Sequence, residues 1–355
     1  MTKYSAVILG AGGRGRTHIR AFLANSDRFE LVAACDRDKP RMEDALKEEN
    51  LSLPIYTDAD EMLAKTKPDV FCFVTQPDVR IEMVRLGATH GVKAIAFEKP
   101  MAITLDEATR IESICREADI KATVCHQHKY AGHWQKVKEI VDSGQIGQIR
   151  TIHATARGWY WYYITHIVNY AMWLADFPKA KWIVGHTHGR DLLLDSHPSP
   201  DYVMGQVGFD SGVRMIFECG PLAPCLGCPD NIWVDAGAIV HGTEGFAEVI
   251  VGKGWRAMTK ESGGKVIADP NFSLEQHNET DHYITALADW LDDDKKPHPC
   301  NVTNALHGYE ICMGMLISSL DHRTVVPPVD RSVPVLERLR HELPAEPFTP
   351  EDPSC

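Results

Sequence analysis

The chain has 355 residues and a formal net charge of −12, from 37 Lys and Arg against 49 Asp and Glu. At roughly 100–200 residues per domain, this length predicts two domains. The acidic balance argues against nucleic acid or an anionic membrane as the main partner. The first apolar run ends before Arg14, and no run approaches the ~20 residues of a membrane span. A cytoplasmic protein without a signal peptide or membrane segment is therefore expected.

The first third of the chain alternates between strand-like and helix-like segments. Apolar runs typical of buried strands occupy 4–10, 29–36 and 92–100, and segments with helical spacing occupy 17–25, 41–50 and 81–91. The segments 55–77 and 105–128 each contain a helical part followed by a strand-like part. Continuous apolar strands between helices predict a parallel sheet that is covered on both faces. Right-handed crossovers then give a doubly wound α/β fold. The pattern predicts a dinucleotide-binding Rossmann domain over residues 1–125.

A glycine-rich turn, GAGGRG, follows the first predicted strand. Gly10, Gly12 and Gly15 form a G-x-G-x-x-G pattern, typical of a tight turn that a pyrophosphate can approach. The free N–H groups at the start of the following helix would bind phosphate. Asp36 ends the second predicted strand, where a carboxylate can accept a hydrogen bond from a ribose 2′-hydroxyl. Its charge favours NAD over NADP, although the adjacent Arg37 could accept a 2′-phosphate.

From about residue 150 the strands are separated mostly by turns. Strand-like segments occupy 149–158, 181–190, 201–220, 236–254 and 255–260, and helical ones 161–176, 277–293 and 303–322. Strands without intervening helices predict a large, mostly antiparallel open sheet. The sequence thus predicts an α+β substrate-binding and oligomerisation domain over 126–327, whose last helices could pack back on the first domain. A Pro- and Glu-rich extended tail is expected over 328–355.

The order of several motifs resembles that of the Gfo/Idh/MocA oxidoreductases. The shared motifs are GAGGRG, Asp36, VTQPDVR, FEKPMA, IVDSGQIGQIR, a histidine-bearing helix, HGTEG and a final pair of helices. The resemblance covers roughly residues 5–325, and the E-K-P tripeptide is its most specific element. It implies a nicotinamide enzyme that acts on a sugar, cyclitol or derivative held between the second sheet and the nicotinamide. It also implies a homo-oligomer, either a dimer or a tetramer.

Lys99, in the E-K-P tripeptide, is the first candidate for catalysis. It follows a strand at the edge where doubly wound folds bind ligands, and it matches the lysine of the family. Burial beside a cationic nicotinamide would lower the pKa of an amine and allow it to take a hydroxyl proton. The alternative is a strand-end lysine that extends into water. Glu98 is expected to orient Lys99. The expected cofactor-binding residues are Gly10, Gly12, Gly13, Arg14, Gly15, Asp36, Arg37, Thr75, Gln76, Glu98 and Lys99.

The predicted helix over 161–176 carries the second group of candidates. Tyr162, His166, Asn169 and Trp173 fall within about 60° of one another on a helix. Many dehydrogenases of the family carry Asp-x-x-x-His here, whereas this chain has Tyr162 in place of the acid, and a neutral phenol cannot supply a carboxylate's charge. The expected catalytic residues are Lys99, His166, Tyr162 and Tyr163, and the expected substrate-binding residues are Lys129, Arg157, Trp159, Tyr163, His166 and Asn169.

Three functions remain open on these residues. The leading one is an NAD-dependent dehydrogenase that transfers hydride from a secondary hydroxyl of a sugar, cyclitol or derivative. Tyr163 and His166 also resemble the Tyr-x-x-His of the family's NAD-dependent glycosidases, which oxidise a sugar transiently, eliminate the aglycone, add water and reduce again. The third is a non-catalytic NAD-binding sensor, which would need the glycines and Asp36 but neither Lys99 nor His166.

The ten cysteines do not suggest a disulfide framework. Only Cys225 and Cys228, in CLGC, have the spacing of metal ligands. A structural zinc site usually needs a second such pair. A plain loop is therefore favoured over a metal site, and no metal is expected.

Overall fold

The computed structural model describes residues 2–194, 198–269, 272 and 278–343, which form two compact units. The first unit comprises the described residues within 1–130 and 277–306, and the second those within 131–276 and 307–355. The prediction of 126–327 as one continuous domain differs from this division, because the segment 277–306 belongs to the first unit.

The first unit is built on a six-stranded parallel sheet with the strand order β3-β2-β1-β4-β5-β6. Its strands are Tyr4–Leu9 (β1), Phe29–Cys35 (β2), Ile55–Tyr56 (β3), Val70–Phe73 (β4), Ala94–Phe97 (β5) and Lys121–Val124 (β6). Every residue of β4 and β5 is buried, as expected for central strands that are covered on both faces. The chain adds β2 and β3 on one side of β1 and β4 to β6 on the other. Folds with this strand order bind their ligands at the carboxyl ends of β1 and β4, where the order reverses.

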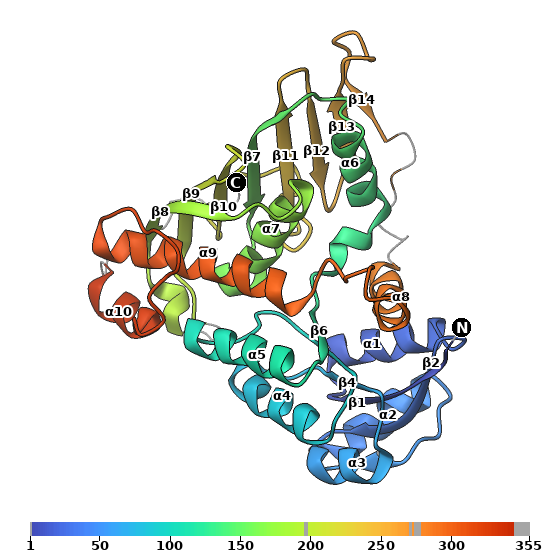
Figure 1. The fold of residues 1–355 in the computed structure, drawn as a ribbon. Coiled ribbons are helices and arrows are strands. Elements are labelled where there is room, and N and C mark those ends of the chain that lie inside the picture. The colour runs from blue at the N-terminus through green and yellow to red at the C-terminus, as the bar shows by residue number, and fades with distance from the viewer. Residues whose placement is uncertain (1, 195–197, 270–271, 273–277, 344–355) are drawn as a thin grey trace. The chain divides into compact units, whose positions relative to one another are not determined.

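Helices cover both faces of this sheet. They span Gly13–Ala24 (α1), Lys39–Glu48 (α2), Ala59–Thr66 (α3), Arg80–Thr89 (α4), Leu105–Glu117 (α5) and Glu279–Asp292 (α8), with short 3-10 turns at Pro77–Val79 (η1) and Gln127–Tyr130 (η2). α1 packs on α8 and α4 packs on α5, and in Figure 1 these pairs lie on opposite sides of the strands. Asp38, Asp58 and Thr104 each cap a helix by accepting a hydrogen bond from the N–H three residues later.

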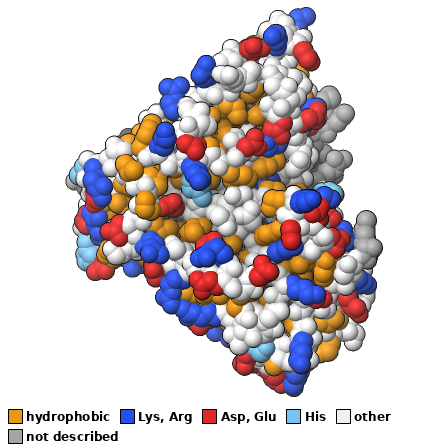
Figure 2. Space-filling model, in the orientation of Figure 1, with side chains coloured by type: hydrophobic (Ala, Val, Ile, Leu, Met, Phe, Trp, Pro, Cys, Tyr) orange, Lys and Arg blue, Asp and Glu red, His pale blue; other side chains and the backbone are white. Residues whose placement is uncertain are grey.

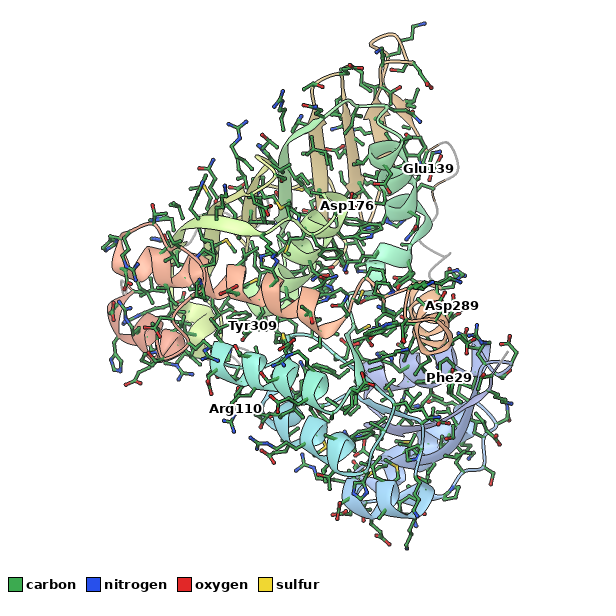
Figure 3. The ribbon with its side chains drawn as sticks, in the orientation of Figure 1. Phe29, Arg110, Glu139, Asp176, Asp289 and Tyr309 are labelled. Atoms are coloured by element: carbon green, nitrogen blue, oxygen red, sulfur yellow. The ribbon has the colours of Figure 1, made fainter. Side chains whose placement is uncertain are left out.

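Helix α8 joins the first unit from a distant part of the sequence. The buried Arg28 donates to Asp289 at 3.0 Å and to Asp292 at 2.9 Å, and Figure 3 labels Asp289 on this helix. The helix predicted over 277–293 is thus present from Glu279, and residue 277 lies outside the described residues.

The second unit is built on an eight-stranded sheet with the strand order β14-β13-β12-β11-β7-β10-β9-β8. Its strands are Ile149–Ala156 (β7), Ala180–His188 (β8), Tyr202–Phe209 (β9), Arg214–Cys219 (β10), Ala236–Gly242 (β11), Phe246–Ile250 (β12), Gly254–Met258 (β13) and Ile267–Ala268 (β14). Neighbouring strands are antiparallel except for the parallel pair β7 and β10. Together the two sheets confirm the predicted fold class.

One face of this sheet is covered by helices. The helices on it are Gly132–Asp142 (α6), Tyr160–Leu174 (α7) and Val302–Asp321 (α9), the last of which begins in the first unit. The second unit also contains Val335–Glu342 (α10) and a 3-10 turn at Asp191–Leu194 (η3). α6 packs over β12 and β13, and α7 over β7, β10 and β11. A Cβ at Gly185 of β8 would lie 2.1 Å from the carbonyl oxygen of Met315, so α9 can pack this closely on β8 only against glycine.

The expectation of an extended tail over 328–355 is wrong for its described part. Helix α10 occupies Val335–Glu342, and the buried Val335 and Leu339 lie one turn apart on the same face. Arg338 pairs with Asp321 at 2.7 Å and with Glu342 at 2.7 Å. The prediction relied on Pro and Glu content, whereas this apolar i, i+4 pair favours a helix. Residues 344–355 lie outside the described residues.

The visible surface carries charges of both signs. Figure 2 shows Lys and Arg side chains interspersed with Asp and Glu. None of the described helices combines the length and the apolar character that crossing a membrane would require.

Candidate active site

The glycine-rich turn between β1 and α1 depends on the absence of side chains at two positions. Gly10 has a φ of +102°, and a Cβ there would lie 2.4 Å from the carbonyl oxygen of Val74. A Cβ at Gly15 would lie 2.0 Å from the carbonyl oxygen of Gly10. Glycine at these positions lets the first turn of α1 pack directly against the ends of β1 and β4.

The start of α1 has the properties of a phosphate site. A Cβ at Gly12 or Gly13 would meet no described atom within 4 Å, so the backbone here faces open space. Among the described residues, no side chain caps the helix and no acid occupies its first turn. The N–H groups at this helix end and the helix dipole therefore favour an anion.

Asp36 lies at the carboxyl end of β2, beside the glycine-rich turn. Its buried carboxylate accepts hydrogen bonds from the N–H of Ala11 at 2.8 Å and of Asp38 at 2.9 Å. A carboxylate has about four acceptor sites, so capacity remains for a ribose hydroxyl. The adjacent Arg37 is exposed.

The segment after β4 also borders this turn. Among the described residues, none forms a hydrogen bond with the buried Thr75 Oγ1. A buried hydroxyl left in this way is costly unless a ligand completes it. Arg80 Nη2 donates to the Thr75 carbonyl at 2.7 Å, while Gln76 is exposed. The open glycine backbone, Asp36 and Thr75 together fit a dinucleotide.

A buried ionic cluster lies beneath the end of β5. Arg14 Nε donates to Glu98 Oε1 at 2.9 Å, and His18 Nε2 lies 3.1 Å from the same oxygen. Burial disfavours the charged carboxylate, but the Arg14 guanidinium and the His18 hydrogen bond hold the pKa of Glu98 well below its usual range. Glu98 is thus an anion that links the first turns of α1 to β5.

This cluster is also the one place among the described residues where three potential metal ligands meet. His18, Glu98 and Cys125 bring their ligand atoms within 4.8 Å of one another. Arg14 Nη2 lies 3.6 Å from Cys125 Sγ, and burial raises the pKa of that thiol well above its ordinary value. A protonated thiol and an adjacent guanidinium both disfavour a cation, so an ion-pair network describes the cluster better.

Lys99 is half-buried directly after Glu98, at the carboxyl end of β5. Burial disfavours the charged amine and lowers its pKa to about 8. The nearby anion Glu98 raises this pKa, whereas the cations Arg14 and Arg80 lower it further. An amine with this pKa can accept and release protons near neutral pH.

Lys129 differs from its predicted role as a substrate-facing residue. Its side chain is fully buried in the first unit, where Nζ donates to the carbonyl of Pro299 at 3.0 Å and lies 3.7 Å from Cys300 Sγ. The amine therefore holds the segment after α8 against η2. The sequence contained no local signal for this, because its partners lie about 170 residues away.

In the second unit, helix α7 carries the remaining predicted catalytic residues. The buried His166 shares a hydrogen bond with the hydroxyl of Tyr170, one turn on, between Nδ1 and the phenol oxygen at 2.7 Å. Asn169 is also buried, and a Cβ at Gly308 of α9 would lie 3.5 Å from Asn169 Nδ2. Trp173 is 7% exposed, so this face of α7 is largely covered and Tyr162 is its half-buried member.

The hydroxyl of Tyr163, a predicted catalytic and substrate-binding residue, bonds to the backbone of the second unit. Its hydroxyl donates to the carbonyl of Trp233, and burial raises its pKa. A phenol held by a backbone carbonyl and made harder to ionise is suited to positioning rather than to proton transfer. Trp233 itself was missed by the sequence reasoning, because it lies outside any periodic segment.

Arg157, which was predicted to bind substrate, contacts a loop of the second unit. Its guanidinium donates to the carbonyl of Pro229 at 3.4 Å and lies 3.6 Å from Asp235 Oδ2. The fully buried Asp235 accepts hydrogen bonds from the N–H groups of Leu226 and Cys228, each at 3.0 Å. Arg157 therefore supports the loop that contains CLGC.

The chain resembles known protein families mainly through the sequence of its first unit. Residues 4–126 match the family model described as an oxidoreductase family with an NAD-binding Rossmann fold. The chain is 30% identical over 159 residues to 1-carboxy-3-chloro-3,4-dihydroxycyclo hexa-1,5-diene dehydrogenase of Comamonas testosteroni, across 41% of this chain and 36% of that protein. It is 29% identical over 145 residues to D-apiose dehydrogenase of Paraburkholderia graminis, across 41% and 38%. These matches span less than half the length of either relative.

The fold is shared with solved structures over a greater length. The crystal structure of an NAD binding oxidoreductase from Klebsiella pneumoniae aligns with a TM-score of 0.79 over 92% of this chain and 100% of that chain, at 17% identity. The likeness therefore extends to both units, at the level of fold. The match to the family model itself is confined to residues 4–126, within the first unit.

Proposed function

We propose that the protein is an NAD-dependent dehydrogenase that oxidises a secondary hydroxyl of a sugar, cyclitol or sugar derivative. The observation that carries the proposal is Lys99, whose pKa of about 8 suits proton transfer and which lies two residues beyond the carboxyl end of β5 in the first unit. D-apiose dehydrogenase and the dihydroxycyclohexadiene dehydrogenase among the relatives support a polyhydroxylated substrate by analogy.

The cofactor would be held by the turn and strand ends of the first unit. The N–H groups at the start of α1 would bind the pyrophosphate, and Asp36 would bind the adenine ribose. The unpartnered hydroxyl of Thr75 would complete its hydrogen bonding on the cofactor. The carboxylate of Asp36 disfavours a 2′-phosphate, which supports NAD over NADP.

NAD, when bound, supplies the acceptor for the hydride. Lys99 would take the proton from the substrate hydroxyl as the carbonyl forms, because its neutral amine is populated near pH 8. Glu98 stays anionic and, through Arg14 and His18, fixes the strand end from which Lys99 extends. In the second unit, Tyr170 orients the ring of His166, which stays a predicted substrate-binding residue.

A substrate screen with two readouts tests the function. Purified protein is incubated with sugars, cyclitols and chromogenic glycosides, and NADH absorbance and aglycone release are followed separately. We expect NADH to accumulate with a free sugar or cyclitol. Aglycone release that needs only catalytic NAD would overturn the dehydrogenase in favour of the glycosidase that Tyr162 and the Tyr163–His166 pair suggest. NAD binding without NADH formation or aglycone release would favour the non-catalytic NAD-binding sensor.

A matched pair of lysine variants tests the assignment of Lys99. Lys93 precedes the same strand, is exposed and pairs with Asp69 at 2.8 Å. Lys99→Ala should abolish most turnover and leave NAD affinity nearly intact, whereas Lys93→Ala should leave both unchanged. Equal turnover in the two variants would refute the role of Lys99. The expected homo-oligomer is tested on the same samples by sedimentation.

A further inference from the structure

One tryptophan of the second unit is unusually exposed. Trp233 is 46% exposed, in the loop that joins β10 to β11. Tryptophan is highly buried on average because its indole has a large apolar area. An exposed indole that the fold nevertheless holds in place suggests a binding role.

The backbone around Trp233 is anchored on both sides. Its carbonyl accepts the hydrogen bond from Tyr163, and its N–H donates to Asn231 Oδ1 at 3.1 Å. The buried Asp235 holds the earlier part of the same loop through two N–H groups and pairs with Arg157. The loop therefore presents the indole in a fixed position, which lowers the ordering cost of binding.

Three rings come together at this point, and we call them the aromatic triad: Trp159, Tyr162 and Trp233. Their ring centroids are 5.5 Å apart for Trp159 and Tyr162, 5.7 Å for Tyr162 and Trp233, and 6.4 Å for Trp159 and Trp233. Trp159 and Tyr162 are half-buried at the start of α7. The triad thus combines two supporting rings with one that is open to a ligand.

The aromatic triad is continuous with His166. The Tyr163 ring stacks on Trp233 with a centroid separation of 6.1 Å and an interplanar angle of 26°, and it lies 5.8 Å from the His166 ring. A ligand on Trp233 would therefore lie on the same part of the second unit as the histidine assigned to the substrate.

We propose that the aromatic triad is a carbohydrate subsite that binds the C–H face of a pyranoside ring. A pyranoside presents weakly positive C–H groups on a flat face, which the negative face of an indole attracts. An open-chain polyol lacks such a face, so the subsite would select the ring form of a sugar. This inference rests on the proposed function, whose substrate class it narrows.

The test measures binding directly, so that it does not depend on turnover. Saturation-transfer NMR with NAD present is recorded for a panel of methyl hexopyranosides of gluco, galacto and manno configuration, and for open-chain glucitol. The proteins are the wild type, Trp233→Ala, Trp233→Phe and Trp255→Ala, the last a control that removes a half-buried indole of β13 outside the triad. Thermal melts and sedimentation confirm that each variant is folded and in the same oligomeric state.

We expect at least one pyranoside to bind the wild type through its ring C–H protons. Trp233→Ala should weaken that binding about tenfold, with Trp233→Phe intermediate, whereas Trp255→Ala should leave it unchanged. Glucitol should respond to none of the changes. Undiminished pyranoside binding in Trp233→Ala, or no pyranoside binding to the wild type, would overturn the subsite. A change in oligomeric state without a change in binding would also overturn it, and would assign Trp233 to a contact between copies.

The two proposals fail in different ways. Trp233-dependent binding without NADH formation from any sugar would refute the dehydrogenase and keep the subsite. NADH formation from a pyranose whose KM is unaffected by Trp233→Ala would refute the subsite and keep the dehydrogenase.

Discussion

The lowered pKa of Lys99 predicts the pH dependence of the proposed oxidation. Burial lowers this pKa from 10.5 to about 8. At pH 8 about half of the amine is then neutral, compared with roughly 0.3% for an ordinary lysine, which is a gain of roughly 150-fold in the basic form. The rate of oxidation should therefore rise with pH and level off above about 8, and the reverse reduction should fall over the same range.

The assay is kcat/KM for NADH formation from pH 6 to 10, compared between the wild type and variants that move the pKa in opposite directions. Glu98 raises the pKa of Lys99, so Glu98→Gln should shift the apparent pKa downward. Arg80 lowers it, so Arg80→Gln should shift it upward. Lys99→Arg cannot supply a neutral amine at any of these pH values and should lose the pH-dependent activity. Lys93→Ala serves as the control with an unchanged profile.

A profile that is flat between pH 6 and 9 would refute the reasoning, provided that hydride transfer limits the rate. Activity retained in Lys99→Arg would refute it as well. Shifts of the same sign in Glu98→Gln and Arg80→Gln would show that the charges around Lys99 do not set its pKa.

Three further predictions concern the first unit. Asp36→Asn should weaken NAD binding about tenfold and reduce the preference for NAD over NADP, because a charged hydrogen-bond acceptor is lost. Titration with both cofactors measures the two effects. Gly15→Ala should impair both NAD affinity and thermal stability, because its Cβ would lie 2.0 Å from the carbonyl oxygen of Gly10; an unchanged melt would contradict this packing. Burial lowers the pKa of His298 from 6.5 to about 3, and Nδ1 accepts the N–H of Cys300 at 3.0 Å. The unfolded state therefore binds the extra proton below pH 6.5, and the free energy of unfolding should fall by about 2 kcal/mol between pH 7 and 5. Urea denaturation of His298→Gln should lack this part of the decrease.

The candidate site illustrates why side-chain roles are harder to predict than elements. Lys129 and Tyr163 both match expected positions along the chain, yet their polar atoms bond to Pro299 and Trp233. The chain separates these partners by 170 and 70 residues, respectively. Nothing in the local sequence indicates the direction in which such a side chain turns.

The sequence by itself determined the features that depend on neighbouring residues. The strand-glycine-helix order and the acid at Asp36 predicted the Rossmann unit, because tight turns and buried parallel strands constrain residue type locally. The position of Lys99 just beyond a buried strand was also predictable in this way, and its catalytic role stays a prediction. The tertiary structure alone decided the rest: the ion pair of Arg14 with Glu98, the bond of Lys129 to Pro299, and the contact of Trp233 with α7. These features arise from packing between distant segments, which leaves no periodic pattern in the residues that take part.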